Sequence, residues 1–148
     1  PDGGYKAMVE EQVNRLNLSK KVLFTGLLTG NDKLSAFVDA SMLVQTSIYE
    51  RGPGSPFEAI LSGTPIIITR NTGAGEIVGK MDAGYLVEYG NIPDLVSLMR
   101  KVLDEPAEIK RKTELARESI IKNLSWQNGV QQFEKVYESL MGKGHKEN

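Results

Sequence analysis

The chain has 148 residues with 40% hydrophobic and 25% charged residues, which is ordinary for one compact soluble domain with a single apolar core. It contains no cysteine, and this excludes disulfides, thiolate nucleophiles and cysteine-based zinc sites. Its net charge of −1 argues against a dedicated nucleic-acid binder, and no apolar run approaches the roughly 20 residues that would span a bilayer.

Helical spacing of apolar residues predicts helices, and short β-rich runs predict strands. In chain order these elements are a helix at 5–16, a strand at 22–25, a helix capped by Asn31, a strand at 41–45, a helix at 56–61, a strand at 65–69, a short helix at 76–78, a strand at 85–87, and helices from residues 92, 106 and 125 onward, the last capped by Ser125. The run 65–69 is nearly continuous and apolar, which is typical of a strand buried on both faces. This alternation predicts a parallel α/β sheet, with ligands bound at the C-terminal edge of its strands.

The loop 46–54 at that edge is the most informative stretch, because it places two carboxylates around a glycine-containing turn and a helix start. Ser55 is suited to cap this helix and Glu58 to occupy its third position, a capping box that would give Glu58 a purely structural role. Alternatively, the turn offers backbone N–H groups to a phosphate, and Glu58 accepts hydrogen bonds from ribose hydroxyls. Glu50 would reach another part of such a ligand, or it is a solvated carboxylate paired with Arg51.

A second glycine-rich turn, residues 71–75, precedes Glu76 at a helix start. It does not match the Gly-x-Gly-x-x-Gly pattern, so a flexible turn explains it as well as a ligand site does. Arg70 before it could meet a phosphate or a carboxylate, or remain a surface arginine. Trp126, Phe133 and Tyr137 recur at helical spacing and are predicted to pack in a core. The single histidine, His145, lies in the polar tail, which excludes a histidine general base in the folded body.

An ordered set of short motifs spans nearly the whole chain. They are Val22–Gly26, Asp39–Ser47, Glu50 and Glu58 with seven residues between them, Gly63–Ile66, Gly73–Val78, Gly84–Val87 and Leu124–Trp126. Each motif alone is weak, but in this order they resemble the C-terminal domain of the group 1, family 4 (GT4-like) glycosyltransferases. The resemblance implies the C-terminal half of a GT-B fold, a partial Rossmann-like parallel sheet with flanking helices.

The resemblance also implies retaining transfer of a sugar from a nucleotide-sugar donor to a glycan, lipid or other acceptor, without a metal or other cofactor. Glu50 would be the catalytic residue that faces the donor sugar, and Glu58 would bind the ribose hydroxyls. Gly52, Gly54 and Ser55 would donate backbone N–H groups to the diphosphate.

Two further positions follow from the resemblance. Leu28 occupies the place where the family holds the base through backbone contacts. Pro53 stands where the family commonly has a glycine, and proline offers no N–H group. The contacts to the diphosphate are therefore expected to shift to Gly54 and Ser55.

We expect residues 1–141 to form the donor-binding domain, cut at its N-terminal side, and residues 142–148 to form a flexible polar tail. In the family, the Arg/Lys pair that grips the diphosphate and the acceptor-binding N-terminal domain both lie upstream. That domain is the expected partner, and without it the isolated chain is expected to be inactive or nearly so. The family implies a cytoplasmic enzyme of polysaccharide or glycolipid biosynthesis, and it leaves open association with the inner face of the membrane through the N-terminal domain.

Two alternatives stay open at this point. The same fold could serve as a non-catalytic nucleotide-sugar-binding module, or it could belong to another GT-B enzyme such as a nucleotide-sugar 2-epimerase. That epimerase class relies on histidine and several acids, and the body of this chain supplies no histidine. A dehydrogenase is disfavoured because no strand is followed by Gly-x-Gly-x-x-Gly.

Overall fold

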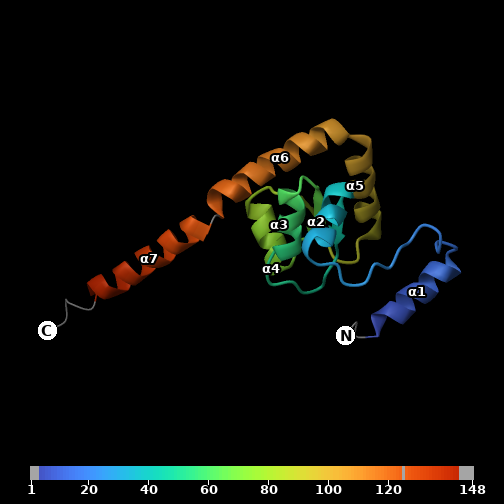
Figure 1. The fold of residues 1–148 in the computed structure, drawn as a ribbon, viewed down its shortest axis with the longest axis horizontal. Coiled ribbons are helices and arrows are strands. Elements are labelled where there is room, and N and C mark those ends of the chain that lie inside the picture. Colours follow the sequence, from blue (N-terminus) through green and yellow to red (C-terminus); the bar gives the residue numbers. More distant parts are fainter. Residues whose placement is uncertain (1–3, 125, 144–148) are drawn as a thin grey trace. The chain divides into compact units, whose positions relative to one another are not determined.

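A computed structural model describes residues 4–124 and 126–143 (Figure 1). The chain divides into two compact units, one ending at Gly30 and the other beginning at Asn31. The first unit carries one helix, and the second carries the sheet with the other described helices. In the described part of the chain, no helix is long and apolar enough to cross a membrane.

The first unit contains α1, Tyr5–Arg15, close to the helix predicted there. Asn17 adopts a left-handed conformation just after it, and the N–H of Leu18 donates back to the carbonyl of Val13 at 2.9 Å. Residues 22–29 form no regular element, so the strand predicted at residues 22–25 is wrong. A β-strand forms when its backbone is hydrogen-bonded to a neighbouring strand. The three strands of the described residues pair only with one another, so residues 22–25 have no strand partner.

The second unit is built on a parallel sheet of order β1-β2-β3, which confirms the predicted parallel α/β class. Its strands are β1 (Leu43–Gln45), β2 (Ile66–Thr69) and β3 (Tyr85–Val87), and its helices are α2 (Gly30–Asp39), α3 (Gly54–Leu61), α4 (Gly73–Lys80), α5 (Ile92–Asp104), α6 (Pro106–Asn123) and α7 (Trp126–Lys143). In the register, Val44 lies opposite Ile67, which in turn lies opposite Tyr85.

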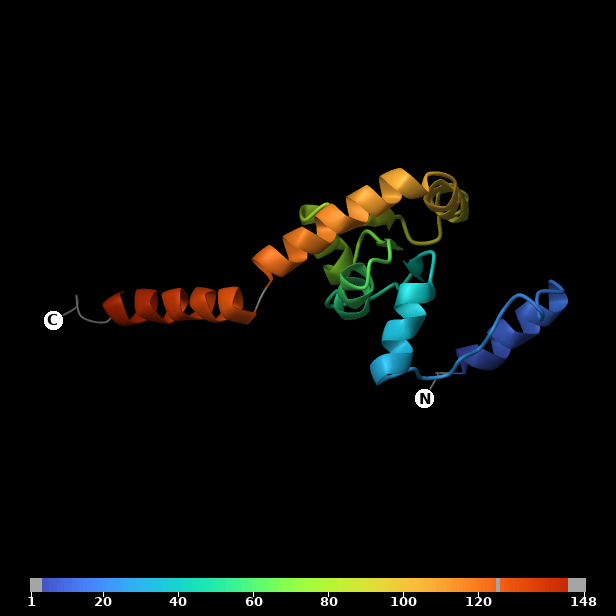
Figure 2. The same cartoon turned by 45° about the horizontal axis from the view of Figure 1, so that its top comes forward.

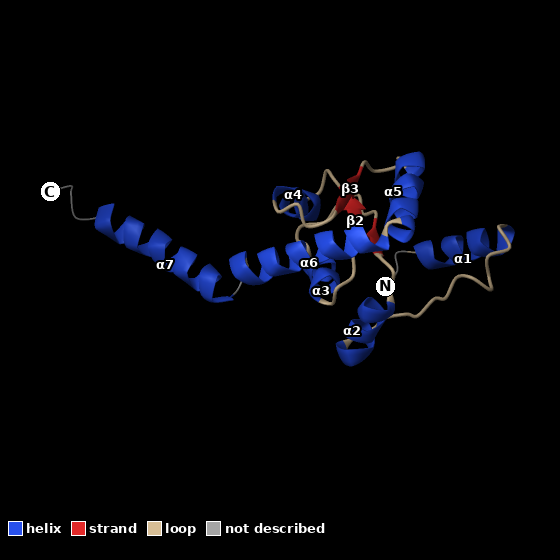
Figure 3. Cartoon of the chain, turned by 90° about the horizontal axis from the view of Figure 1, so that it is seen from above, coloured by secondary structure: helices blue, strands red, loops and turns tan. Residues whose placement is uncertain are grey.

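The central strand β2 is buried along its whole length, as its apolar sequence predicts. Ile66 and Ile68 point to one face and pack against residues of α3, α4 and α6. Ile67 points to the other face and packs against α5 and the start of α6. Helices therefore cover both faces, with α4 and α5 on opposite sides of the strands (Figure 3). Each of these buried isoleucines contributes on the order of 1.5–3 kcal/mol through removal from water.

Helix α6 connects the two apolar clusters. It follows α5 after a sharp turn at Glu105 and lies at a steep angle to it (Figures 1 and 2). Its buried residues recur every three or four positions, the spacing of one helix face: Ile109, Thr113, Ala116 and Ile120. Ile109 joins the cluster beneath α5, whereas Ala116 and Ile120 join the cluster beneath α3. The helix thereby holds α3, on which the candidate site is built, against the sheet.

Two predictions about the helices are corrected by the structure. Asn31 does not cap α2 but lies inside it, because Gly30, at a φ of 53°, turns the chain into the helix one residue earlier. On α7, the side chains of Trp126, Phe133 and Tyr137 are 85%, 67% and 62% exposed, so they are not core residues in this structure. Their helical spacing places them on one face of α7, but an apolar face is buried only where another part of the protein packs against it. Ser125 and His145 lie outside the described residues.

Candidate functional site

The C-terminal ends of β1 and β2 lead into α3 and α4, and the two intervening loops meet at this edge of the sheet. The N–H of Ala74 donates to the carbonyl oxygen of Glu50 at 3.3 Å. A Cβ atom on Gly73 would lie 2.5 Å from the carbonyl oxygen of Arg51, closer than real Cβ contacts allow. The backbone of the first loop therefore rests directly on the start of α4, which is where parallel topology predicts a ligand site.

The glycine-rich turn before α4 has a structural explanation. A Cβ atom on Gly75 would lie 2.2 Å from the carbonyl oxygen of the last residue of β2. Three amides of the first turn of α4 are also occupied, because Ala74 donates to the Glu50 carbonyl, Gly75 donates to the Thr72 hydroxyl at 2.9 Å, and Glu76 donates to the Thr72 carbonyl at 2.9 Å. Close packing and capping therefore account for this turn without a ligand.

Helix α3 begins earlier than the sequence pattern predicts. Its N-cap is Pro53, whose carbonyl oxygen accepts the N–H of Phe57 at 2.8 Å, and no side chain caps it. Ser55 is therefore the second helical residue and Glu58 the fifth, and the predicted capping box is wrong. The reason is that Pro56 is tolerated anywhere in the first helical turn, because the N–H group that proline lacks would have no partner there. The helix can therefore extend back to Gly54.

The start of α3 is open, in contrast to the start of α4. The N–H groups of Gly54 and Ser55 donate to no other group in residues 4–124 and 126–143. A Cβ atom on Gly52 or Gly54 would meet nothing within 4 Å, and neither residue has a positive φ. Neither packing nor backbone conformation thus requires glycine at these two positions. Free amides at the positive end of a helix are suited to bind an anion such as a phosphate.

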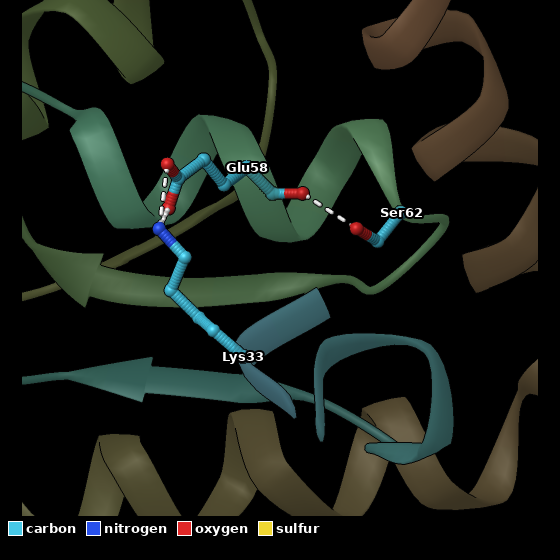
Figure 4. A network of polar contacts seen from close by, with 3 residues as sticks. All are labelled: Lys33, Glu58 and Ser62. Carbon is cyan, nitrogen blue, oxygen red and sulfur yellow. Dashed lines mark hydrogen bonds and ion pairs between the residues drawn. The ribbon is translucent and has the colours of Figure 1, made fainter. Parts of the chain in front are cut away.

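Glu58 projects from α3 toward α2 and forms an ion pair there. The Nζ atom of Lys33 lies 2.9 Å from one carboxylate oxygen of Glu58 and 2.8 Å from the other (Figure 4). Both side chains remain partly accessible, at 35% for Lys33 and 41% for Glu58. The Ser62 hydroxyl donates to the backbone carbonyl of Glu58 at 2.9 Å, which leaves the carboxylate itself unaffected. The carboxylate of Glu58 is therefore held in one orientation by Lys33 and stays accessible to solvent.

Glu50 is held by the end of β1. The Nε2 atom of Gln45 donates to a carboxylate oxygen of Glu50 at 2.9 Å, and Glu50 is half-buried. Arg51 does not pair with Glu50, which was one interpretation of the sequence, because its Nε atom donates to the Tyr49 hydroxyl at 2.9 Å. A neutral amide fixes one oxygen of the Glu50 carboxylate and leaves its charge uncompensated.

A separate polar cluster lies at the ends of β2 and β3. Glu88 forms an ion pair with Arg70, whose Nε atom lies 3.0 Å from a carboxylate oxygen, and it accepts a hydrogen bond from the Asn71 side chain at 2.8 Å. Arg70 is therefore engaged within the protein. Glu88 also borders a cavity of about 240 Å³ between the end of β1 and the start of α5. This cavity is lined by none of the residues that the sequence assigns to the donor site.

Leu28 lies in the first unit, where it is half-buried in a segment without regular structure. Its contact with a base remains a prediction. Among residues 4–124 and 126–143, no three His, Asp or Glu side chains gather in a way that could hold a metal ion. Burial raises the pKa of Tyr85 above its ordinary value, against an opposing effect of Lys101, but Tyr85 begins β3 and so lies away from the edge described above.

Lys33 and Gln45, the two partners of the predicted carboxylates, were not predicted from the sequence. Gln45 carried a usable signal, since it is a polar residue at the C-terminal end of a strand, five residues before Glu50. Lys33 carried none, because it lies 25 residues before Glu58 and only the packing of α2 brings the two together.

Comparison with known proteins places this arrangement in a family. The model of "Glycosyl transferases group 1" matches residues 2–138. The 2-deoxystreptamine glucosyltransferase of Streptomyces kanamyceticus is 30% identical over 96% of this chain and 37% of its own length. The sucrose-phosphate synthase of Thermosynechococcus elongatus superposes with a TM-score of 0.79 at 25% identity, over 97% of this chain and 36% of that one.

A shorter structure resembles this chain as well. The C-terminal domain of a group 1 family glycosyl transferase, LpcC from Francisella tularensis, superposes with a TM-score of 0.71 at 20% identity, over 84% of this chain and 65% of that one. These likenesses show that the chain has the fold of part of a GT-B glycosyltransferase. The chain spans little more than a third of the length of the glucosyltransferase and of the sucrose-phosphate synthase.

Proposed function

Because this chain belongs to the glycosyl transferases of group 1, we propose that it is the donor-binding, C-terminal half of a retaining glycosyltransferase. In this proposal the donor is a nucleotide sugar, and an N-terminal domain of the same protein binds the acceptor. The cysteine-free sequence fits the cytoplasmic location that we propose with it.

The observation that carries the proposal is the open start of α3 with a carboxylate on either side of it in the chain. The free N–H groups of Gly54 and Ser55 suit a diphosphate, whose charge is favoured at the positive end of a helix. In this proposal Glu58, farther along α3, accepts hydrogen bonds from ribose hydroxyls. Glu50, before the helix, is assigned to the donor sugar. The order of these groups follows the order of the parts of a nucleotide sugar.

The proposed chemistry depends on stabilising the diphosphate that leaves when the sugar is transferred. Backbone N–H groups and a helix dipole can stabilise such charge without reorganising during the reaction. The Arg/Lys pair expected upstream in the same protein would add positive side chains. The carboxylate of Glu50, fixed by Gln45, would act on the sugar, where positive charge develops as the bond to the diphosphate breaks.

The substitution Glu50→Gln in the full-length protein tests the catalytic part of the proposal. It keeps the size of the side chain and removes its charge, so sugar transfer should fall about 100-fold or more while donor affinity changes little. Transfer is measured with UDP-, GDP- and ADP-sugars, and donor affinity is measured by calorimetry. The control Glu114→Gln removes a half-exposed carboxylate on α6 and should leave both unchanged.

Two outcomes would contradict this part of the proposal. Full transfer activity in the Glu50→Gln variant would remove Glu50 from the catalytic machinery. A wild-type protein that binds a nucleotide sugar but transfers no sugar from it would favour the non-catalytic binding module instead.

A further inference from the structure

The ion pair between Lys33 and Glu58 joins two helices that are distant in sequence. Lys33 lies in the first part of α2, and its Nζ atom contacts both carboxylate oxygens of Glu58, at 2.9 and 2.8 Å (Figure 4). Glu58 lies on α3, just beyond the two open amides. An ammonium group that bridges both oxygens fixes the plane of the carboxylate more firmly than a contact to one oxygen would.

This arrangement leaves acceptor capacity on Glu58. A carboxylate has about four lone-pair positions, and one bridging ammonium group uses about two of them. Two acceptor positions remain, one on each oxygen, and the carboxylate is 41% exposed. Two acceptors side by side match a vicinal diol, the 2′- and 3′-hydroxyls of a ribonucleotide, because each hydroxyl donates one hydrogen bond.

The position of Lys33 is tied to the same core that carries α3. Phe37, one helical turn after Lys33, packs against the cluster that includes Ala59 and Ile60 of α3. The Thr64 hydroxyl donates to the carbonyl oxygen of Phe37, and Thr64 is buried. The spacing between α2 and α3 is therefore set by the core and not by the ion pair. A partly exposed ion pair contributes little to folding stability. The contact is therefore better explained by its effect on the orientation of Glu58 than by an effect on folding.

We propose that Lys33 is a positioning residue that orients the Glu58 carboxylate toward the ribose diol and thereby sets a preference for ribonucleotides over 2′-deoxyribonucleotides. This inference depends on the proposed function, in which Glu58 binds the ribose. Lys33 does not itself contact the nucleotide. Its contribution is that the carboxylate is already ordered when the ligand binds, so less conformational entropy is lost on binding.

The test measures this preference in the full-length protein by calorimetric titration. The probes are UDP, GDP and ADP with their 2′-deoxy counterparts, and the quantity of interest is the ratio of the two dissociation constants for the base that binds tightest. A site that hydrogen-bonds the 2′-hydroxyl should give a ratio of about ten or more in the wild-type protein. Lys33→Met keeps most of the aliphatic stem and removes the ammonium group, and it should lower the ratio below about three.

Two further variants act as controls for Lys33→Met. Lys33→Arg keeps a cation that can contact both carboxylate oxygens, so it should retain a ratio near that of the wild type. Lys112→Met removes an ion pair of matched length, 2.9 Å to Asp82, on α6, and it should not change the ratio. A merely structural contribution of Lys33 would weaken ribo- and deoxyribonucleotides equally and leave the ratio intact.

Glu58→Gln separates a failure of this inference from a failure of the proposed function. If Glu58→Gln lowers the ratio and Lys33→Met does not, the inference about Lys33 is overturned and the role of Glu58 stands. If Glu58→Gln also leaves the ratio unchanged, Glu58 is not the diol acceptor, and both fall. The absence of binding of all three nucleoside diphosphates to the wild-type protein would overturn both as well.

Discussion

At the scale of single residues, the two carboxylates of the site differ in their partners. Glu58 is held by a cation, Lys33, whereas Glu50 is held by a neutral amide, Gln45. A cationic partner compensates the charge of a carboxylate, and a neutral amide only orients it. This difference agrees with the two roles proposed for them, since Glu58 would bind hydroxyl groups and Glu50 would act on a centre where positive charge develops.

The substitution Gln45→Leu tests whether this orientation matters for Glu50. The variant removes the hydrogen bond to the carboxylate and keeps a side chain of similar size at the end of β1. We expect kcat for sugar transfer to fall about tenfold, because a hydrogen bond to a charged group is lost. The affinity for a nucleoside diphosphate alone, measured by calorimetry, should remain within about twofold. An equal loss of transfer and of nucleotide affinity would show that the whole loop has moved and would count against a specific effect on Glu50.

At the scale of elements, α3 and α4 are helices of equal length that follow neighbouring strands, yet their starts differ. The start of α4 is packed and capped, with Thr72 and the Glu50 carbonyl accepting its amides. The start of α3 keeps two amides free and two glycines in open space. Backbone N–H groups at a helix start that have no partner in the protein donate to solvent or to a ligand. The start of α3 is therefore the better candidate for binding an anion.

A pair of matched substitutions, Gly54→Ala and Gly75→Ala, tests this difference. At Gly75 the new methyl group meets the backbone at 2.2 Å, so the free energy of unfolding should fall by about 2 kcal/mol or more. At Gly54 it meets nothing within 4 Å, so stability should be unchanged or rise by about 0.5 kcal/mol. Urea unfolding of the full-length protein measures both.

The same Gly54→Ala variant should bind a nucleoside diphosphate about tenfold more weakly, because the methyl group enters space that the ligand would use. Unchanged nucleotide affinity in Gly54→Ala would argue that the open space at the start of α3 is not the binding site.

The sequence predicted the elements well where the local pattern and the tertiary environment agree. The apolar run at residues 66–69 is a buried central strand, and α5 begins at Ile92, the residue at which a helix was predicted to begin. Predictions failed where the structure of a segment depends on contact with another segment of the chain. Residues 22–25 have strand-forming side chains but no paired strand, and Trp126 has helical spacing but no covering surface among the described residues.

The candidate site was predictable in part for the same reason. The positions of Glu50 and Glu58 at the sheet edge follow from chain order and parallel topology. Their partners depend on packing between segments, as with Lys33 on α2, and no local pattern encodes such a contact. The capping box at Ser55 was a local pattern, and it is not formed because Pro53 is the N-cap of α3.

At the scale of the whole molecule, we propose that the chain supplies one side of a reaction site. It spans 37% of the length of the Streptomyces kanamyceticus glucosyltransferase that it resembles. We propose that the remaining part of the protein supplies the acceptor site and the positive side chains for the diphosphate. We propose that the donor binds at the start of α3, whatever the identity of the acceptor.

The most direct test of that claim is a calorimetric titration of the full-length protein and its Glu58→Gln variant with UDP-, GDP- and ADP-sugars. We predict that the wild-type protein binds one of these donors with one-to-one stoichiometry, and that Glu58→Gln weakens this binding about tenfold through loss of hydrogen bonds to a charged group. If the wild type binds none of the three, or if Glu58→Gln binds its donor as tightly as the wild type does, the assignment of the donor site to the start of α3 is contradicted.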